Sequence, residues 1–196
     1  MTSHTPTDAD LVAAIAGGDL NALGDLVHRH QDRVMALAYR FLGCRHRAAD
    51  AAQEVFLKVA RAAPRYTPDA RFTTWLYRIV VNHCLDDVRR QKRSPRTLSA
   101  VPAVPDDPPG DDADPLEADE TARQVRAAIA ALPERQRTAV LLHRYEDLSH
   151  RAIAEVTGWT PSAVESLLVR AYANLRKTLA PLADGDASAG NPPGKR

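Results

Sequence analysis

The sequence predicts an all-α protein in which a flexible acidic linker joins two small helical domains, the C-terminal one a helix-turn-helix. Apolar residues recur at helical spacing through most of the chain, and the sequence shows no period-2 alternation typical of strands. Residues 94–119 interrupt this pattern, because they are rich in Pro and Asp and have no periodicity. A segment of that composition cannot bury enough apolar surface to fold alone, so we interpret it as the linker.

Gly and Pro residues mark most of the expected helix ends in the N-terminal domain. We divide the chain into an N-terminal domain, a linker, a C-terminal domain and a disordered tail, over residues 1–93, 94–119, 120–180 and 181–196. The first domain is expected to contain four helices, over about residues 10–16, 20–42, 46–62 and 71–93, with a loop over 63–70. The second helix either runs without interruption or restarts near Gln31.

The C-terminal domain is also expected to contain four helices. They cover about residues 119–132, 133–145, 149–156 and 160–179. Pro133 suits the first position of a helix, and Ser149 suits an N-cap. The turn around Gly158 separates a short helix from a longer one, capped by Thr160 or Ser162, an arrangement typical of a helix-turn-helix. A plain helical hairpin is the alternative interpretation.

The helix expected over residues 71–93 is apolar around most of its circumference, which indicates burial on most sides. One polar stripe remains, about 80° wide at roughly 100° per residue. It contains Arg71, Trp75, Arg78, Asn82, Asp86, Arg89 and Arg93. Cations suit phosphates and a flat ring suits an unstacked base, so the stripe is typical of a site for a nucleic-acid strand. The alternative is a core helix with a solvated basic edge.

The net charge of +1 hides an uneven distribution. Residues 28–93 carry fourteen Lys and Arg against six Asp and Glu, and residues 121–180 carry nine against five. Residues 94–120, in contrast, carry one Arg against eight acids. Two basic domains on either side of an acidic segment indicate two separate contacts with a polyanion.

Other features exclude several classes of protein. No run of about 18 apolar residues predicts a transmembrane helix, and the N-terminus has no apolar signal core, so we expect a cytoplasmic protein. Cys44 and Cys84 lack C-x-x-C spacing and lie in apolar helical contexts, so we expect reduced core thiols, with a thiol redox sensor as the alternative. The sequence contains neither a Gly-rich phosphate loop nor a nucleophile–base spacing, and we expect no enzymatic activity, cofactor or metal.

Residues from about Asp8 to Leu179 resemble a bacterial RNA polymerase sigma factor of the sigma-70 family, extracytoplasmic-function type. The matching stretches are AADAAQEVFLKV, RFTTWLYRIVVNHCLDDVRRQKR and LPERQRTAVLLHRYEDLSHRAIAEVTGW, in the family's order and spacing. The resemblance implies promoter-specific transcription initiation. An N-terminal domain would bind core RNA polymerase and melt the promoter's minus-ten element, and a C-terminal domain would read the minus-thirty-five element. An anti-sigma factor is a further implied partner.

The resemblance also implies roles for individual residues. The helix that docks on the clamp helices of the largest polymerase subunit matches at Asp50, Gln53 and Glu54. The base-capturing loop and the minus-ten-reading helix match at Arg65, Arg71, Trp75, Arg78, Asn82 and Arg89. The recognition helix for the minus-thirty-five element keeps polar side chains at Ser162, Ser166, Arg170 and Asn174.

Several of these assignments have structural alternatives. The acids of the docking helix could form an ordinary solvated face. Trp75 could be a packing residue against the third helix, and Asn82, in an apolar run, could make an internal hydrogen bond. The chain also departs from the family, since Thr73 stands where Lys or Arg is usual. The recognition helix is less basic than usual, with other residues at four positions where the family often has Lys, Arg or His: Glu165, Leu167, Val169 and Tyr172.

Two other classes of function remain open at this point. A stand-alone helix-turn-helix regulator of duplex DNA would account for residues 149–179, but not for the acidic face or the cationic helix. A metal or redox enzyme would have to use the available His and Cys residues. These are His28, His30, Cys44, His46, His83 and Cys84. His83 and Cys84 point about 100° apart on one helix, which is poor geometry for shared ligation.

Overall fold

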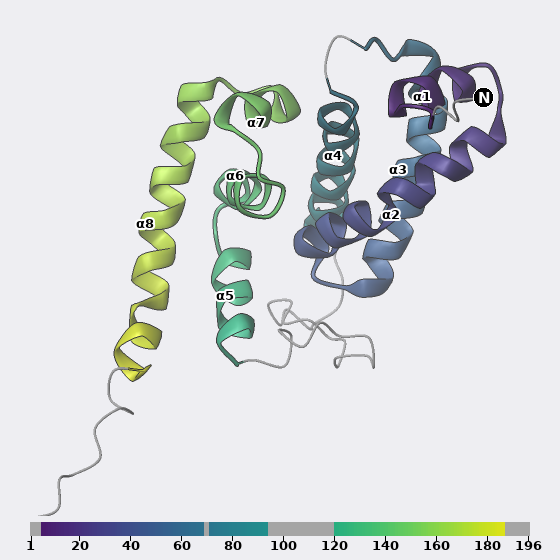
Figure 1. Cartoon of the computed structure of the whole chain (residues 1–196). Helices are drawn as coiled ribbons and strands as arrows, with labels where there is room; N and C mark the ends of the chain where they lie inside the picture. The colour runs from purple at the N-terminus through teal and green to yellow at the C-terminus, as the bar shows by residue number, and fades with distance from the viewer. Residues whose placement is uncertain (1–4, 69–70, 94–119, 187–196) are drawn as a thin grey trace, which may run out of the picture.

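The computed structural model describes residues 5–68, 71–93 and 120–186, with side chains as far as Pro181. All regular structure in these ranges is helical, and it forms two groups of helices that lie side by side (Figure 1). The predicted all-α class is therefore confirmed. The predicted linker, residues 94–119, lies outside the described residues. Within the described ranges, no helix combines the length and the apolar character needed to cross a membrane.

The N-terminal domain contains four α-helices and a short 3-10 helix. They are α1 (Asp8–Ala16), α2 (Leu20–Leu42), α3 (Arg45–Ala62), η1 (Ala63–Arg65) and α4 (Phe72–Arg93). α1 starts two residues before its predicted start because Thr7 and Asp10 form a capping box, each side chain accepting a hydrogen bond from the other's backbone N–H. α2 continues through Gln31 and ends at Gly43, whose φ of 67° is left-handed and favours glycine.

The core of the N-terminal domain is built around α2. This helix contributes the fully buried side chains of Leu26, Val34 and Leu37, and it packs most extensively against α3 and also against α1 and α4. Val55 and Val59 are the corresponding fully buried residues of α3. Burial of these side chains, and of Leu76 and Val80 on α4, fixes the rotation of α3 and α4, so that the polar residues of both helices face away from the core.

The C-terminal domain contains α5 (Glu120–Ala130), α6 (Glu134–Tyr145), α7 (His150–Thr157) and α8 (Pro161–Asp186). The Ser149 hydroxyl caps α7, and Gly158, with a left-handed φ of 75°, ends it. The Thr160 hydroxyl accepts a hydrogen bond from a backbone N–H of α8, so Thr160 rather than Ser162 is the cap. The order α7, Gly turn, α8 confirms the predicted helix-turn-helix.

α8 extends further than the sequence predicted. The domain was expected to end at residue 180 and to be followed by a disordered tail, but α8 continues to Asp186 with Pro181 inside it. Proline lacks an N–H and removes one helical hydrogen bond. The neighbouring Ala and Leu residues are among the strongest helix formers, and they favour continuation of the helix past this point.

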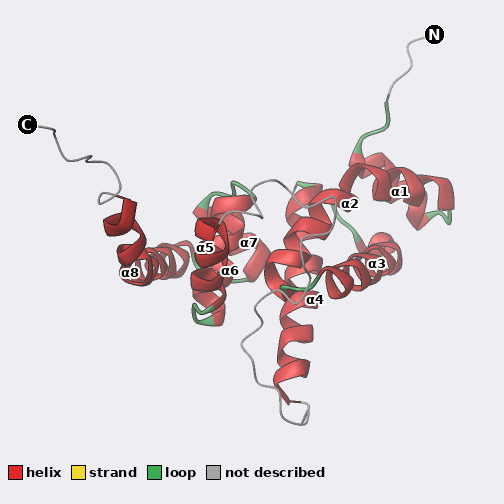
Figure 2. Ribbon diagram, turned by 90° about the horizontal axis from the view of Figure 1, so that it is seen from below, coloured by secondary structure: helices red, strands yellow, loops and turns green. Residues whose placement is uncertain are grey.

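The two domains contact each other directly. α4 packs against α7, and α2 packs against α6, as the views in Figures 1 and 2 show. The buried apolar residues of both domains join in one cluster. The predicted division into two separate domains did not include this contact. One of its interactions joins Arg33 to Glu146, which lie 113 residues apart in the chain. A pair so distant in sequence leaves no local sequence signal.

Candidate polymerase and nucleic-acid interface

The predicted polymerase-binding residues share the solvent-facing side of α3. Asp50, Gln53 and Glu54 are all exposed, since Val55 and its neighbours on the opposite side fill the core. Leu57 lies one turn further along and is 45% exposed. An acidic helix face with an exposed leucine suits a protein partner whose surface is basic and partly apolar.

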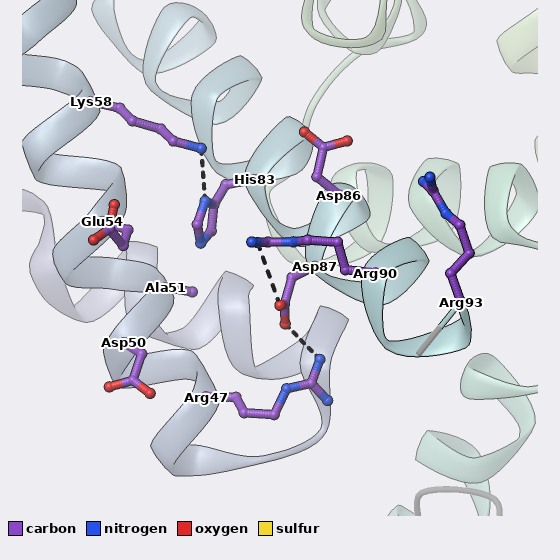
Figure 3. A pocket seen from close by; sticks show the side chains of 10 residues that line it. All are labelled: Arg47, Asp50, Ala51, Glu54, Lys58, His83, Asp86, Asp87, Arg90 and Arg93. Carbon is purple, nitrogen blue, oxygen red and sulfur yellow. Dashed lines mark hydrogen bonds and ion pairs between the residues drawn. The ribbon is translucent and has the colours of Figure 1, made fainter. Parts of the chain in front are cut away.

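A groove of about 780 Å³ runs between α3 and α4, and Asp50 and Glu54 are among the residues that line it (Figure 3). An ion pair connects the two helices along this groove, and a second one lies within α4. Asp87 of α4 accepts a hydrogen bond from Arg47 of α3 at 2.6 Å and lies 3.6 Å from Arg90 (Figure 3). The pair of Arg47 with Asp87 holds α3 against α4, the helix that carries the cationic stripe.

His83 reaches the same groove from α4, although it is only 9% exposed. The Lys58 ammonium lies 2.8 Å from its Nδ1 (Figure 3). Lysine has only donors, so Nδ1 accepts and the ring proton is on Nε2. Burial lowers the pKa of His83, and the charge of Lys58 lowers this pKa further. The imidazole is therefore neutral at neutral pH.

The predicted minus-ten residues of α4 lie mainly on its exposed side. Arg78, Asn82 and Arg89 are all exposed. The amide of Asn82 therefore needs no internal partner, which removes the reason for expecting a buried hydrogen bond. The two guanidinium groups do contact the C-terminal domain, because Arg78 donates to the backbone carbonyl of Glu155 and Arg89 donates to Glu134 at 2.7 Å.

Trp75 is partly buried and packs within its own domain. Its ring centre lies 4.9 Å from that of Tyr66 and 5.8 Å from that of Phe72, and Phe72 in turn lies 5.1 Å from His30. Tilted aromatic pairs at these distances are attractive. Trp75 therefore has a packing role, but the ring contacts are with the start of α4 and the segment after η1 rather than with the third helix considered from the sequence.

The predicted base-capturing loop is described on both sides of residues 69–70. Arg65 ends η1 and Arg71 directly precedes α4, and both side chains are exposed. The contact between Tyr66 and Trp75 anchors the start of this loop to the first turn of α4. Two cations thus flank the loop where it joins the polar side of α4.

The helix-turn-helix presents a second polar surface. Ser162, Ser166 and Arg170 follow one another at four-residue intervals on the exposed side of α8. Together with Arg135 and Gln136 at the start of α6, they line a groove of about 570 Å³. A row of hydroxyl and guanidinium donors at one-turn spacing is suited to the edges and phosphates of a DNA groove.

Arg135 is a candidate that the sequence reasoning missed. Its guanidinium lies 4.6 Å from the ring centre of Trp159, and this cation–π contact holds a positive charge at the groove that contains Arg170. Only the packing of α6 on α8 reveals this, since no local motif marks Arg135. Asn174, in contrast, donates to Gln136 at 2.9 Å and is already hydrogen-bonded inside the domain.

The less basic positions of α8 have different surroundings. Leu167 is 8% exposed and belongs to the core, so its apolar side chain serves packing. Glu165 is exposed, and Val169 is 65% exposed. The Tyr172 hydroxyl lies 3.1 Å from Nδ1 of His143. The exposed acid and valine make this recognition surface less cationic than the stripe of α4.

Comparison with known proteins identifies the family. Residues 26–94 match the Sigma-70 region 2 model, and residues 122–175 match the Sigma-70 region 4 model. The sigma factor SigE of Mycolicibacterium smegmatis, of the extracytoplasmic-function group, is 37% identical over 183 residues, which cover 89% of this chain and 70% of that protein. SigM of Mycobacterium tuberculosis is 36% identical, and the match covers 93% of this chain and 89% of SigM. The chain belongs to the extracytoplasmic-function sigma factors of RNA polymerase.

Solved structures agree with this assignment. CnrH, in complex with the cytosolic domain of CnrY, superposes with a TM-score of 0.65 at 27% identity, covering 91% of this sigma factor and 98% of CnrH. The sigma factor RpoE of Bartonella quintana, in complex with the anti-sigma factor NepR, superposes with a TM-score of 0.64 at 18% identity and shares the fold. The superposition covers 80% of this chain and 96% of RpoE. The sigma factor therefore directs promoter-specific transcription initiation, and a stand-alone regulator is not favoured.

The cysteines and histidines of the sigma factor do not form a metal site within its described residues, where no group of three potential ligands is close enough to hold an ion. Cys84 is buried in α4, and burial raises its pKa to about 12. Cys44 is partly exposed, at the start of α3. Because the thiolate is the reactive form, Cys84 is unreactive at neutral pH.

We expect iodoacetamide to alkylate Cys44 in the native sigma factor and to leave Cys84 unmodified. With a pKa of about 12, only roughly one Cys84 thiol in ten thousand is ionised at pH 8. Peptide mass spectrometry of native and urea-unfolded protein measures both sites. The Cys44→Ser variant should stay unlabelled until urea unfolds it. Equal labelling of both cysteines in the native protein would contradict this expectation.

Proposed function

We propose that this sigma factor divides its work among three polar surfaces. The exposed side of α3 binds core RNA polymerase, the polar side of α4 binds the melted minus-ten strand, and the groove between α6 and α8 binds the minus-thirty-five duplex. The observation that carries the proposal is that each surface is exposed and has side chains suited to its partner. These are acids on α3, cations on α4, and hydroxyl and guanidinium donors at the groove between α6 and α8. The proposal assigns no catalytic step to this chain, and it places the chain in the cytoplasm with the polymerase.

Polymerase docking uses Asp50, Gln53 and Glu54 in this proposal. The two carboxylates are exposed and so keep their hydration until a basic partner surface approaches. Leu57 adds apolar area at the same face. Charged groups around an apolar contact favour fast and specific association, which suits a subunit that must compete for a shared polymerase.

Promoter melting uses the loop and stripe residues in this proposal. Arg65 and Arg71 neutralise phosphates at the loop, while Arg78, Asn82 and Arg89 follow the strand along α4. A base leaving the duplex loses a few kcal/mol of stacking, which new contacts must offset. The aromatic cluster around Trp75 stiffens the loop base, so that these contacts form without much further ordering.

Recognition of the minus-thirty-five element uses Ser162, Ser166 and Arg170, with Asn174 further along α8. Arg135 joins them as a phosphate contact, because its guanidinium is held at the rim of the same groove by Trp159. The site has few cations for a DNA-binding surface. Binding of the isolated C-terminal domain to promoter DNA is therefore expected to be weak, with specificity provided mainly within the holoenzyme.

An anti-sigma factor is the regulator in this proposal. The related RpoE is bound by the anti-sigma factor NepR, which supports the same kind of partner for this chain. Such a partner would have to cover the α3 or α4 surface to keep the sigma factor from polymerase. Co-purification of the sigma factor from its native host, followed by competition with core polymerase, would identify it.

The proposed function is tested by reconstitution. Purified sigma factor and core RNA polymerase are combined with genomic DNA fragments, and the transcripts are mapped at their starting ends. We expect discrete start sites that depend on the sigma factor and share upstream elements at fixed spacing. Core polymerase that yields the same transcripts without the sigma factor would refute the proposed function.

Arg170→Ala is expected to weaken holoenzyme binding to promoter duplex by about 1–3 kcal/mol if Arg170 reads a base pair bidentately. Its Nε donates to the Ser166 carbonyl at 3.0 Å, and this bond does not involve the two terminal nitrogens that read guanine. Fluorescence anisotropy at several salt concentrations measures the loss. A phosphate contact would instead weaken all sequences alike and reduce the salt slope. Unchanged affinity and slope would exclude Arg170 from the site.

A further inference from the structure

An exposed valine lies in the first half of the recognition helix. Val169 of α8 is 65% exposed, whereas its chain neighbours Leu167 and Leu168 are buried. Single exposed apolar residues are common, so exposure alone assigns no role to this side chain. Its place in the fold does, because α8 follows the turn at Gly158, and in a helix-turn-helix the first turns of the second helix enter the major groove.

Polar side chains lie on both sides of Val169. At about 100° per residue, Ser166 and Arg170 lie about 60° and 100° to one side, and Tyr172 lies about 60° to the other. The major groove is about 12 Å wide, and a helix with its side chains is about 10–12 Å across, so the helix fills the groove from wall to wall. The centre of its exposed face then meets the base edges, and its two sides meet the phosphates. Val169 is therefore placed against base edges.

The chemistry of the base edges limits what Val169 can contact. The C5-methyl group of thymine is the apolar partner that the major groove offers. The amino groups, ring nitrogens and carbonyl oxygens of the other edges would lose bound water against an apolar side chain without gaining a hydrogen bond. Val169 therefore favours a thymine.

Glu165 lies one turn before Val169 and is also exposed. None of the ion pairs among the described residues involves it. Its carboxylate only accepts hydrogen bonds, and phosphates repel it. The donors on the base edges are the amino groups of cytosine and adenine. In adenine the acceptor N7 lies beside the amino group and repels a carboxylate, whereas cytosine presents a donor alone, so Glu165 favours a cytosine.

We propose that the upstream promoter element of this sigma factor carries a thymine against Val169 and a cytosine against Glu165. The proposal rests on the proposed role of α8 in binding the minus-thirty-five duplex. Residues four apart are separated by about 6 Å along a helix, and stacked bases by about 3.4 Å, so the two bases lie one or two steps apart. At two positions where the family often has Lys, Arg or His, which suit the acceptors of guanine, this chain thus reads an amino group and a methyl group.

The thymine contact is tested by removing the methyl group from the DNA. Reconstituted holoenzyme first selects binding sites from a duplex library with a randomised upstream segment. Each thymine of a selected site, on either strand, is then replaced by uracil, which keeps the base pair and lacks only the methyl group. We expect uracil at one position to weaken binding roughly fourfold, the effect of exposing one buried methyl group. With Val169→Ala holoenzyme, the same uracil should have no effect.

Thr178→Ala is the matched control for Val169→Ala. Threonine has nearly the size of valine, and Thr178 is exposed on the same helix but points about 180° away from Val169. Its hydroxyl donates to the Asn174 carbonyl at 3.1 Å, within α8. The Thr178→Ala holoenzyme should therefore show the same loss on uracil substitution as the unmodified holoenzyme.

The cytosine contact is tested by a change of preference. Glutamine pairs with adenine, because its amide donates to N7 and accepts from the amino group. Glu165→Gln holoenzyme should therefore select adenine in place of cytosine at one position of the library and keep the other preferences. A misfolded domain would lose all preferences together, so a change confined to one base pair reports the contact itself.

The possible outcomes separate the two contacts from the proposed function. A selected site in which no uracil weakens binding, or in which uracil weakens binding equally with Val169→Ala, would overturn the thymine contact. Unchanged base preferences of Glu165→Gln would overturn the cytosine contact. A holoenzyme that selects no shared upstream sequence at all would refute the proposed recognition of the minus-thirty-five element, and both contacts with it.

Discussion

Leu37→Ala is expected to lower the free energy of unfolding of the N-terminal domain by about 2–5 kcal/mol. Leu37 is fully buried on α2, the helix that packs against α1, α3 and α4. Removal of its side chain leaves a cavity among helices that are already fixed by other contacts. Because domains are stable by only about 5–15 kcal/mol, the loss should be visible as an early transition in urea or thermal unfolding followed by circular dichroism.

The matched control is Leu20→Ala, on the same helix. Leu20 is 79% exposed, so the same change in chemistry should alter stability by no more than about 0.5 kcal/mol. If the two variants lose equal stability, burial on α2 does not hold this domain together. If only Leu37→Ala is destabilised, it should also lose polymerase binding and DNA binding together, since α2 supports both α3 and α4.

Most of the fold could be predicted from the sequence because its signals are local. Helical periodicity is visible within each helix itself. The caps at Ser149, Gly43 and Gly158 directly adjoin the helices whose ends they define. The predicted end of α8 was wrong, because residues from 181 on were interpreted as a disordered tail, whereas the helix continues to Asp186 through Pro181.

The candidate sites were only partly predictable, because exposure depends on packing. The sequence could not decide whether Asn82 needs an internal partner, and the structure shows that it is exposed. Nor could it show that Arg135 stacks on Trp159 beside the recognition helix, or that Glu146 pairs with Arg33 across the two domains. Such contacts join residues that are far apart in the chain, and they leave no periodic pattern.

Glu54→Arg is expected to weaken binding to core RNA polymerase by at least about tenfold, or about 1.4 kcal/mol, while Asn82→Ala should leave this affinity unchanged. Glu54 is exposed on α3 and Asn82 is exposed on α4, so neither substitution removes core packing. On the docking surface proposed for α3, a reversed charge opposes a basic partner directly, and like charges across an interface are costly. Fluorescence titration of labelled sigma factor with core polymerase measures both affinities.

Asp25→Arg serves as the charge-reversal control, because Asp25 is also an exposed acid, on α2, and does not line the groove beside Glu54. Its polymerase affinity should match that of the unmodified protein. Asn82→Ala holoenzyme should bind promoter duplex normally and yet show reduced permanganate reactivity of thymines in the bubble, since the contact proposed for Asn82 is made only to unpaired DNA. Circular dichroism first verifies that all three variants are folded. If Asn82→Ala reduces polymerase affinity as much as Glu54→Arg does, α3 and α4 do not divide docking and melting between them.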